Sequence, residues 1–376
     1  MDGVDILRGL AILFVLMNHV NIRLLIADVP YLKFLPRQLA HTLVWNGQMG
    51  VQMFFVVSGF LITSTTLKRW GTLSNISVAD FYKLRFARIA PLLLALLGIL
   101  SILHFSHVTN YVVTEKTGGL GRALLAALTF RVNVLEARRG YLPGSWDVLW
   151  SLSVEEMFYL FFPLACWLLG RGKWFIALLG TLVVLGPFGR TVWAHGNEIW
   201  EEYSYLGRMD AIALGCLTAL MVARVRLSRR AIRILPGLGL AMLVFMLGFS
   251  IQAYHWGFGR TGTDMTVLAV GTCLVIIAAA QTQWKSPRVL EPLLTLGRNS
   301  YEVYLTHMFL VFVFFGLFLR EGKPMSLVPV FFVALIVAAG LLGAGVAKLY
   351  SEPVNRRLRA RFGYQSKSTL AVEPRG

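Results

Sequence analysis

Apolar residues run along the chain in ten stretches, separated by polar connections. Each stretch is close to the roughly 20 residues that a helix needs to cross the hydrocarbon core of a bilayer. Such runs are too long and too uniform for a soluble core. The pattern predicts an all-α integral membrane protein with about ten transmembrane helices, at residues 6–26, 48–67, 89–106, 151–169, 174–192, 209–223, 234–251, 264–282, 299–319 and 327–349.

Composition and charge support this fold class and give it an orientation. Hydrophobic residues make up 56% of the 376 positions and charged residues 15%, against about a quarter charged in soluble domains. The net charge of +17 does not indicate nucleic-acid binding, because the basic residues gather in short connections beside the apolar runs. Most of them fall on the side of the two termini, which predicts that both termini are cytoplasmic. The sequence divides into a membrane domain (1–350) and a cytoplasmic basic tail (351–376), which we expect to be disordered after Tyr364.

The remaining features of the chain predict no further domain and no metal site. The longest outer connection, 107–150, contains a candidate interfacial helix at 120–131. Cys166, Cys216 and Cys273 each lie inside an apolar run and are expected to be buried thiols, with no disulfide or metal. The N-terminal segment carries charges and then a long span, so we expect no cleavable signal peptide.

Ionisable side chains inside a membrane span are costly and are therefore candidates for function. Arg8 and His19 both belong to the first span and lie eleven residues apart. Eleven helical steps return to within about 20° of the start, so both lie on one helix face, about 16 Å apart along the axis. His19 is a candidate general base, and the alternative is an interhelical hydrogen bond.

Two further pairs flank predicted spans. Arg85 and Arg88 precede the third span on one helical side, where they could bind phosphates or simply anchor the helix at the membrane surface. Glu155 and Glu156 open the fourth span. A structural explanation is available for them, because Ser153 could cap the helix and acids stabilise its positive end.

Other polar positions are less distinctive. Arg208 and Asp210 begin the sixth span and could form ion pairs with neighbours. His307 is isolated in the ninth span and could be structural. Ser58 and Gly59 form a small-residue site in the second span that predicts close helix packing.

Taken as a set, these motifs resemble the membrane acyltransferase-3 family, the bacterial multi-pass O-acyltransferases. The similarity rests on seven motifs that occur in the family's order over essentially the whole chain: Leu7-Arg8-Gly9-Leu10-Ala11 through His19, Phe54 to Thr63, Arg85-x-x-Arg88 with Pro91, Trp150 to Glu156, Arg208-x-Asp210, Ser300-Tyr301-x-x-Tyr304-Leu305-Thr306-His307, and Glu352-Pro353. Met157 stands where the family often has Gln, and the segment before Asp5 is shorter than in many members. No SGNH hydrolase-like domain follows the tenth span, so the resemblance implies a stand-alone form.

The resemblance implies a function and a set of site residues. It implies transfer of an acyl group, typically acetyl, from cytoplasmic acyl-CoA to a hydroxyl of a cell-surface or secreted glycan, in the bacterial inner membrane. We expect no tightly bound cofactor; acyl-CoA, a carbohydrate acceptor and membrane lipids are the expected partners. The expected residues are His19, Arg8, Glu155 and Glu156 for catalysis, Arg85 and Arg88 for CoA, and Ser58, Trp150, Arg208, Asp210, Tyr304 and His307 for substrate.

Two other classes of protein share some of these features. Intramembrane Arg, His and Glu also form proton relays in secondary transporters and flippases, but the sequence shows no inverted repeat. A non-catalytic subunit of a glycan-assembly complex is the second alternative. The sequence does not identify the acceptor, which could be an O-antigen, an exopolysaccharide, peptidoglycan, a macrolide or a lipid-linked sugar.

Overall fold

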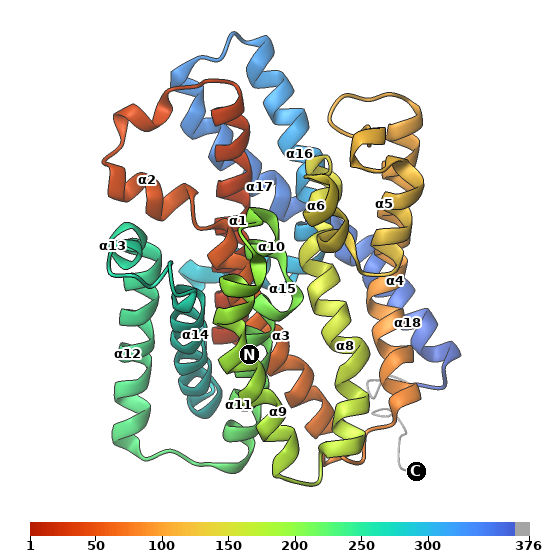
Figure 1. The fold of residues 1–376 in the computed structure, drawn as a ribbon, viewed down its shortest axis with the longest axis vertical. Helices are drawn as coiled ribbons and strands as arrows, with labels where there is room; N and C mark the ends of the chain where they lie inside the picture. Colours follow the sequence, from red (N-terminus) through yellow and green to blue (C-terminus); the bar gives the residue numbers. More distant parts are fainter. Residues whose placement is uncertain (365–376) are drawn as a thin grey trace, which may run out of the picture.

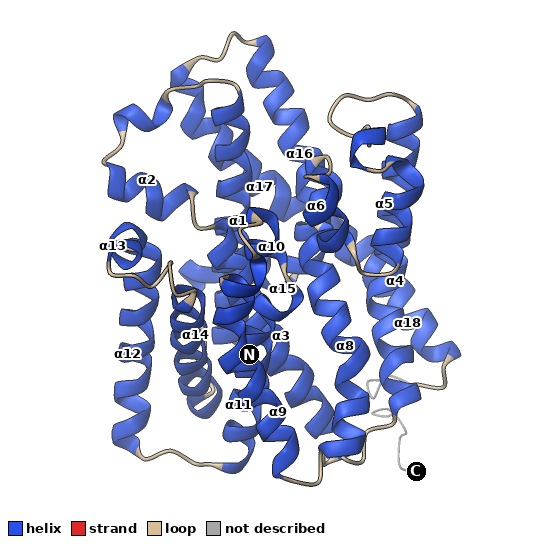
Figure 2. Cartoon of the chain, in the orientation of Figure 1, coloured by secondary structure: helices blue, strands red, loops and turns tan. Residues whose placement is uncertain are grey.

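The computed structural model describes residues 1–364, and its regular secondary structure is helical throughout this range (Figures 1 and 2). A π-helical segment, Ala347–Ser351, joins the last two helices. The α-helices are α1 Asp2–Ile26, α2 Arg37–Val44, α3 Gly47–Trp70, α4 Val78–Phe105, α5 Gly119–Leu128, α6 Val132–Arg139, α7 Gly144–Asp147, α8 Leu149–Leu169, α9 Lys173–Arg190, α10 Glu198–Tyr203, α11 Tyr205–Arg224, α12 Arg229–Gly248, α13 Ser250–His255, α14 Thr263–Thr282, α15 Glu291–Arg298, α16 Ser300–Arg320, α17 Val328–Val346 and α18 Glu352–Arg361.

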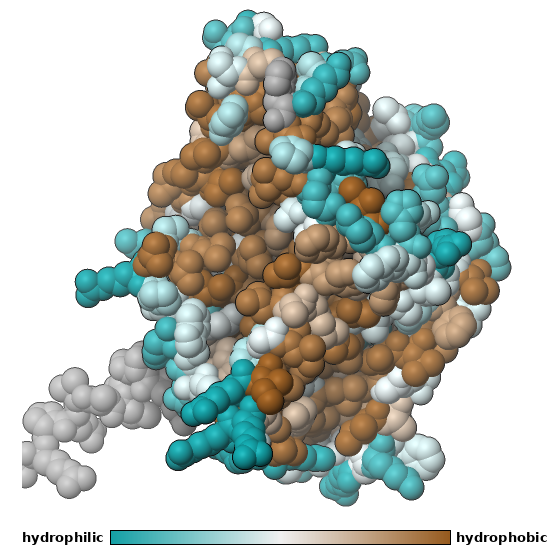
Figure 3. Space-filling model, turned by 90° about the vertical axis from the view of Figure 1, so that its left-hand side faces the viewer, coloured by the Kyte–Doolittle hydropathy of each residue, from teal (hydrophilic) through white to brown (hydrophobic). Residues whose placement is uncertain are grey.

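Ten helical segments within residues 1–364 are long and apolar enough to cross a membrane, which confirms the predicted fold class. Their lipid-facing sides carry large apolar side chains. On α12, for example, Ile234, Leu238 and Leu240 are each more than half exposed. Figure 3 shows that apolar side chains cover this flank, while polar side chains gather towards its ends. The protein is therefore a multi-pass membrane protein.

The ten spans alternate in direction and give the molecule two polar faces. We call the first the tail face; it carries the connections 71–77, 170–172 and 225–228, the segment 283–299 and helix α18. The second, the loop face, carries the connections 27–46, 106–143, 191–204, 249–262 and 321–327. The predicted interfacial helix is present on the loop face as α5, which ends at Leu128 because Phe130 adopts a positive φ of 56°. The three cysteines are free and buried, as predicted.

Glycines bring α3 and α11 into backbone contact. A Cβ atom on Gly59 would lie 2.0 Å from the carbonyl oxygen of Ile212, and one on Gly215 would lie 2.0 Å from that of Val56. Neither position can accommodate a side chain, so the two helices pack as closely as their backbones allow. The close packing predicted at Ser58-Gly59 is thus confirmed.

One predicted helix start was far from its place. Helix α4 begins at Val78 instead of residue 89, because Ser77 Oγ accepts the Asp80 N–H at 3.3 Å and the polar segment that follows continues the helix. Helix α8 begins at Leu149, directly after the short α7 and two residues before the predicted start. Within the predicted tail, residues 352–361 form α18, which packs against α4. Residues 365–376, where we expected disorder, lie outside the described range.

Candidate active site

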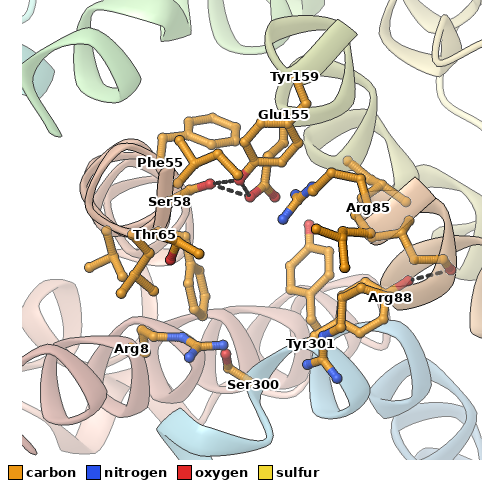
Figure 4. Close-up of a pocket in the computed structure, with 18 of the residues that line it drawn as sticks. Arg8, Phe55, Ser58, Thr65, Arg85, Arg88, Glu155, Tyr159, Ser300 and Tyr301 are labelled. Atoms are coloured by element: carbon orange, nitrogen blue, oxygen red, sulfur yellow. Dashed lines mark hydrogen bonds between the residues drawn. The ribbon is translucent and has the colours of Figure 1, made fainter. Parts of the chain in front are cut away.

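A cavity of about 400 Å³ lies between α3, α4, α8 and α16 and is completed by α1 and α18 (Figure 4). Residues from the tail-face ends of these helices, among them Arg69, Trp70 and Arg359, form its mouth. Phe54, Ser151 and Tyr304 line its inner end. The cavity therefore runs from the tail face into the membrane-spanning part of the protein.

The cavity is strongly basic. Of the residues that line it, one is a carboxylate, Glu155, whereas five are arginines, namely Arg8, Arg69, Arg85, Arg88 and Arg359. Such a concentration of guanidinium groups suits a ligand with several negative charges, because arginine makes charge-assisted and bidentate contacts with phosphate. A polyanion is the ligand class that the mouth fits best.

Arg85 and Arg88 lie one turn apart on α4, and a carboxylate and an aromatic ring fix each of them. Arg85 Nη2 lies 3.3 Å from Glu156 Oε1, and Arg88 Nη1 lies 3.2 Å from a Glu302 oxygen. The Arg85 guanidinium also stacks 3.5 Å from the ring centre of Tyr159. Both arginines therefore reach the cavity as positioned groups, and the anchoring interpretation does not account for their ion pairs.

Glu155 faces the cavity, whereas its neighbour Glu156 faces Arg85. The Ser58 hydroxyl donates to Glu155, and the Tyr159 hydroxyl donates to Glu155 Oε1 at 2.5 Å. The capping explanation of these acids was wrong, because Ser153 lies one turn inside α8. Its hydroxyl donates to the Leu149 carbonyl at 3.0 Å and accepts a backbone N–H from α6.

The two intramembrane histidines predicted as site residues are in contact. His307 Nε2 lies 3.3 Å from His19 Nδ1, and the ring centres are 4.9 Å apart. The interpretation of His307 as an isolated residue was therefore wrong. No Glu155 or Glu156 contact with His19 occurs in residues 1–364, so neither carboxylate orients that ring directly.

Their hydrogen bonds assign the proton on each ring. His307 Nδ1 lies 2.7 Å from the Tyr304 carbonyl oxygen, so this nitrogen carries the proton and Nε2 is an acceptor. His19 Nδ1 lies between that acceptor and the Val15 carbonyl oxygen, 2.9 Å away, so it carries the second proton. In the neutral pair, His19 Nε2 is left with a free lone pair, as a general base or nucleophile requires.

Tyr304 connects the cavity to the histidine pair. It lines the inner end of the cavity, and its ring centre lies 5.8 Å from that of His307. Its hydroxyl donates to the Val148 carbonyl at 2.9 Å and lies 2.7 Å from Ser151 Oγ, which fixes the ring. Arg8 also lines the cavity and points towards Ser300 (Figure 4), but no contact joins it to His19 in the described chain.

Asp210 lies in a buried network away from the cavity. Its carboxylate accepts two hydrogen bonds from the Arg190 guanidinium, at 2.9 and 3.0 Å, and others from Gln52 at 3.1 Å and Thr266 at 2.6 Å. These partners come from α3, α9 and α14, so the Asp210 carboxylate on α11 ties four helices together. The interpretation that Asp210 forms an ion pair with a neighbour is supported, and the partner is Arg190.

Arg208 and Trp150 are also buried outside the cavity. Arg208 donates to Gln52 at 3.1 Å and to Gln48 at 2.8 Å, and its guanidinium lies 5.6 Å from the Trp150 ring centre. The Trp150 ring stacks on Tyr203 with centres 4.0 Å apart. Neither residue lines the donor-sized cavity, in contrast to Ser58 and Tyr304.

We expect Asp210→Asn to destabilise the protein. The substitution would leave the Arg190 guanidinium, 6% exposed, without its counter-charge, and breaking a buried pair typically costs about 3–5 kcal/mol. Thermal unfolding of the purified protein in detergent should show a lower midpoint. The exposed Asp28→Asn is the control, and an equal midpoint for Asp210→Asn and the wild type would contradict this role.

Comparison with known proteins gives the family. A family described as an acyltransferase domain, acyltransferase-3, matches residues 1–346. This chain belongs to that family. The predicted membership of the acyltransferase-3 family is confirmed. No solved structure matches the chain.

Similar proteins of the family carry the name O-acetyltransferase OatA. Those of Staphylococcus aureus strains NCTC 8325 / PS 47 and COL are each 23% identical over 388 aligned residues. The match covers 98% of this chain and 59% of either relative. The chain therefore spans less than two thirds of the length of these members of the acyltransferase-3 family.

The structure adds lining residues that the sequence reasoning missed. Tyr159 could have been found, because it lies four residues after Glu155 and thus on the same helix face. Tyr301 lies one turn before Tyr304 on α16 and contacts α4 through a 2.9 Å hydrogen bond to the Ile89 carbonyl. Arg359 gave no such signal, because the apolar pattern ends before α18.

Proposed function

We propose that this member of the acyltransferase-3 family transfers an acyl group from cytoplasmic acyl-CoA to a hydroxyl group of a glycan across the membrane. The arginine-lined cavity carries this proposal, because it runs from the tail face to Tyr304, whose ring centre lies 5.8 Å from that of His307 in the histidine pair. It joins a binding site for a polyanion to a neutral histidine with a free lone pair. Both are needed for transfer from a thioester of a charged carrier.

The arginines would hold the phosphates of CoA at the tail face, which we propose to be cytoplasmic. The pantetheine arm would then extend past Ser58, Glu155 and Tyr159 to Tyr304. Glu155, whose oxygen already accepts two hydroxyl groups, would accept an amide N–H of that arm. Only the small acyl group would pass the histidines, so the charged carrier never enters the apolar core.

His19 would act as the general base. Its Nε2 takes the proton of the acceptor hydroxyl while the oxygen attacks the thioester carbon. The new C–O bond forms, the C–S bond breaks, and the proton on His19 passes to the leaving thiolate, which gives the ester and free CoA. His307 Nε2 accepts the Nδ1–H of His19 and stabilises the imidazolium that forms in this step.

Acetyl is the acyl group that we propose, because the OatA relatives are named O-acetyltransferases. We further propose that the protein lies in the bacterial inner membrane with both termini cytoplasmic. The basic connections of the tail face support this orientation.

The test is acyl-CoA-dependent ester formation by the full chain in lipid nanodiscs. Purified protein is mixed with labelled acetyl-CoA and an oligosaccharide, and the product is identified by mass spectrometry. Nanodiscs have no gradient across them, so product formation supports an enzyme and would not arise from a transporter. Absence of product with every acyl-CoA supplied, from protein that binds CoA, would refute the proposal.

A separate prediction concerns the mouth of the cavity. Arg69→Ala and Arg359→Ala should each raise the KM for acyl-CoA about 10- to 100-fold, the equivalent of one charge-assisted contact, with little change in kcat. Neither arginine has a carboxylate partner in residues 1–364, so the substitutions leave no buried charge unpaired. Steady-state kinetics checks this, with the exposed Arg139→Ala of the loop face as control. An unchanged donor KM in both variants would contradict the role.

A further inference from the structure

A second group of polar side chains lies on the loop-face side of the histidine pair. Asn133 and Glu136 lie one turn apart on α6, and Trp146 and Asp147 belong to α7, with Asp147 close to Glu136. Arg23, near the loop-face end of α1, completes the group. We call these five residues the loop-face cluster. None of them lines the arginine-rich cavity.

The two carboxyl groups of the cluster are close neighbours. Glu136 is fully buried, its Oε1 accepts the Leu142 N–H at 3.0 Å, and its carboxyl group lies close to that of Asp147. Burial, together with the neighbouring Asp147, raises the pKa of Glu136 well above its ordinary value. The Tyr203 hydroxyl donates to Asp147 Oδ1 at 3.2 Å. The protonated form of Glu136 is therefore favoured.

Several buried polar atoms in this small region have no protein partner among residues 1–364. They come from four members of the cluster and one neighbour: Arg23 Nε, Asn133 Oδ1, Glu136 Oε2, Trp146 Nε1 and Ser145 Oγ. Each such atom costs about 1–3 kcal/mol if it is left unsatisfied. They include both donors and acceptors, so a ligand that satisfies them must offer both.

One edge of the cluster reaches the loop face, whereas Asn133, Glu136 and Trp146 are buried behind it. Tyr141 at its edge is 53% exposed, and Arg23 and Asp147 are partly exposed. The Tyr141 and Tyr203 rings meet edge to face with centres 6.0 Å apart, and Tyr203 stacks on Trp150. Hydrogen-bond donors and acceptors thus lie beside aromatic rings. This combination suits a ligand with many hydroxyl groups, because each hydroxyl can both donate and accept.

The cluster is also next to the candidate base. Arg23 follows His19 by four residues and lies on the same face of α1. A Cβ atom built on Gly144 of α7 would lie 3.0 Å from Arg23 Nη2 and 2.8 Å from the Met308 side chain, adjacent to His307. A ligand held by Arg23 and Asp147 would thus reach the histidine pair from the side opposite the donor cavity.

From these observations we propose that the loop-face cluster is the acceptor site and binds a neutral sugar. This inference rests on the function proposed above and assigns its second substrate. Asp147 accepts a sugar hydroxyl, and Trp146 Nε1 and Arg23 donate to sugar oxygens. One further hydroxyl is then directed at His19 Nε2. The two sites differ as their ligands do: five arginines line the donor cavity, whereas the cluster presents a mixture of hydrogen-bond donors and acceptors.

The test separates the KM values of the two substrates. Full-length protein in nanodiscs is assayed with acetyl-CoA and two probe sugars, maltotriose and chitotriose, and with butanol as a non-sugar alcohol. Glu136→Gln, which preserves shape and hydrogen bonding, and Trp146→Phe should each raise the sugar KM at least tenfold while the acetyl-CoA KM stays within twofold. Glu198→Gln, an exposed acid of the loop face, should leave both KM values unchanged.

Each other outcome is decisive. If the variants lower kcat and leave the sugar KM unchanged, or shift both KM values together, the cluster is structural and the assignment is wrong. Equal use of butanol and the sugars would overturn the sugar class. If the variants do not fold, Tyr203→Phe, which removes only the hydroxyl on Asp147, must raise the sugar KM. Acetyl-CoA hydrolysis or transfer by the wild type shows whether the proposed function itself holds, independently of these variants.

Discussion

Replacing His19 with alanine is expected to reduce acyl transfer by about 10²–10⁴-fold, the typical contribution of a general base. The reason is geometric. His19 Nε2 is the one nitrogen of the His19–His307 pair that carries no proton and accepts no hydrogen bond within residues 1–364. Initial rates of ester formation in nanodiscs measure the effect. Acetyl-CoA binding should stay unchanged, because the arginines of the cavity are intact.

A matched histidine provides the control for this variant. His255 is exposed on the loop face in α13, far along the chain from the cavity residues, so His255→Ala should keep the wild-type rate. A folded His19→Ala protein that transfers acetyl groups at the wild-type rate would refute the role of His19. The two proteins can also be incubated with labelled acetyl-CoA in the absence of acceptor. If the wild-type protein retains the label and His19→Ala does not, the reaction passes through an acyl-histidine and not through direct transfer.

The spans were predictable because bilayer thickness imposes a length on each apolar run, and the ten runs match ten helices. The start of α4 was not predictable, because a helix extends beyond the bilayer wherever its backbone is capped and its polar side chains find partners. Ser77 supplies such a cap, and Arg85 and Arg88 find Glu156 and Glu302. Hydropathy registers none of these contacts.

The site was predictable as a set of residue types but not as a set of pairs. An apolar run fixes the depth of His19 and of His307 but not the rotation of either helix, so it gives no sign that the two rings meet across 288 residues of sequence. The same holds for Asp210, whose partner Arg190 lies at the end of a different span. The roles of Arg85 and Arg88 in CoA binding, and of Ser58 and Tyr304 in substrate binding, stay predictions.

The two proposed sites lie on opposite sides of the histidine pair, and this arrangement fixes the direction of proton movement. In the proposed reaction the acyl group would move from the tail face towards the loop face. The proton of the acceptor hydroxyl would move the opposite way, to the thiolate of CoA. The group between the two sites must therefore accept a proton from the acceptor and release it to the donor. A neutral imidazole can do both, and more readily than a carboxylate or a guanidinium in that position.

His307→Ala is expected to lower kcat about 10²-fold while the KM values for donor and acceptor stay within about threefold. His307 touches neither the cavity nor the loop-face cluster, so it is a positioning residue. The Nε2 atom of His307 holds the proton of His19 on Nδ1, and this leaves the Nε2 atom of His19 free. Without it, only the Val15 carbonyl at 2.9 Å favours that tautomer, and the imidazolium loses its nearest acceptor.

His307→Gln distinguishes positioning from packing. The glutamine amide oxygen can accept the His19 Nδ1–H much as the ring nitrogen does, so this variant should recover a large part of the rate that His307→Ala loses. Thr306→Ala is the neighbouring control, because the Thr306 hydroxyl donates only to the Glu302 carbonyl of its own helix, at 2.8 Å. Equal kcat values for His307→Ala and His307→Gln would show that the site needs the ring for its shape, and that the hydrogen bond to His19 does not set the rate.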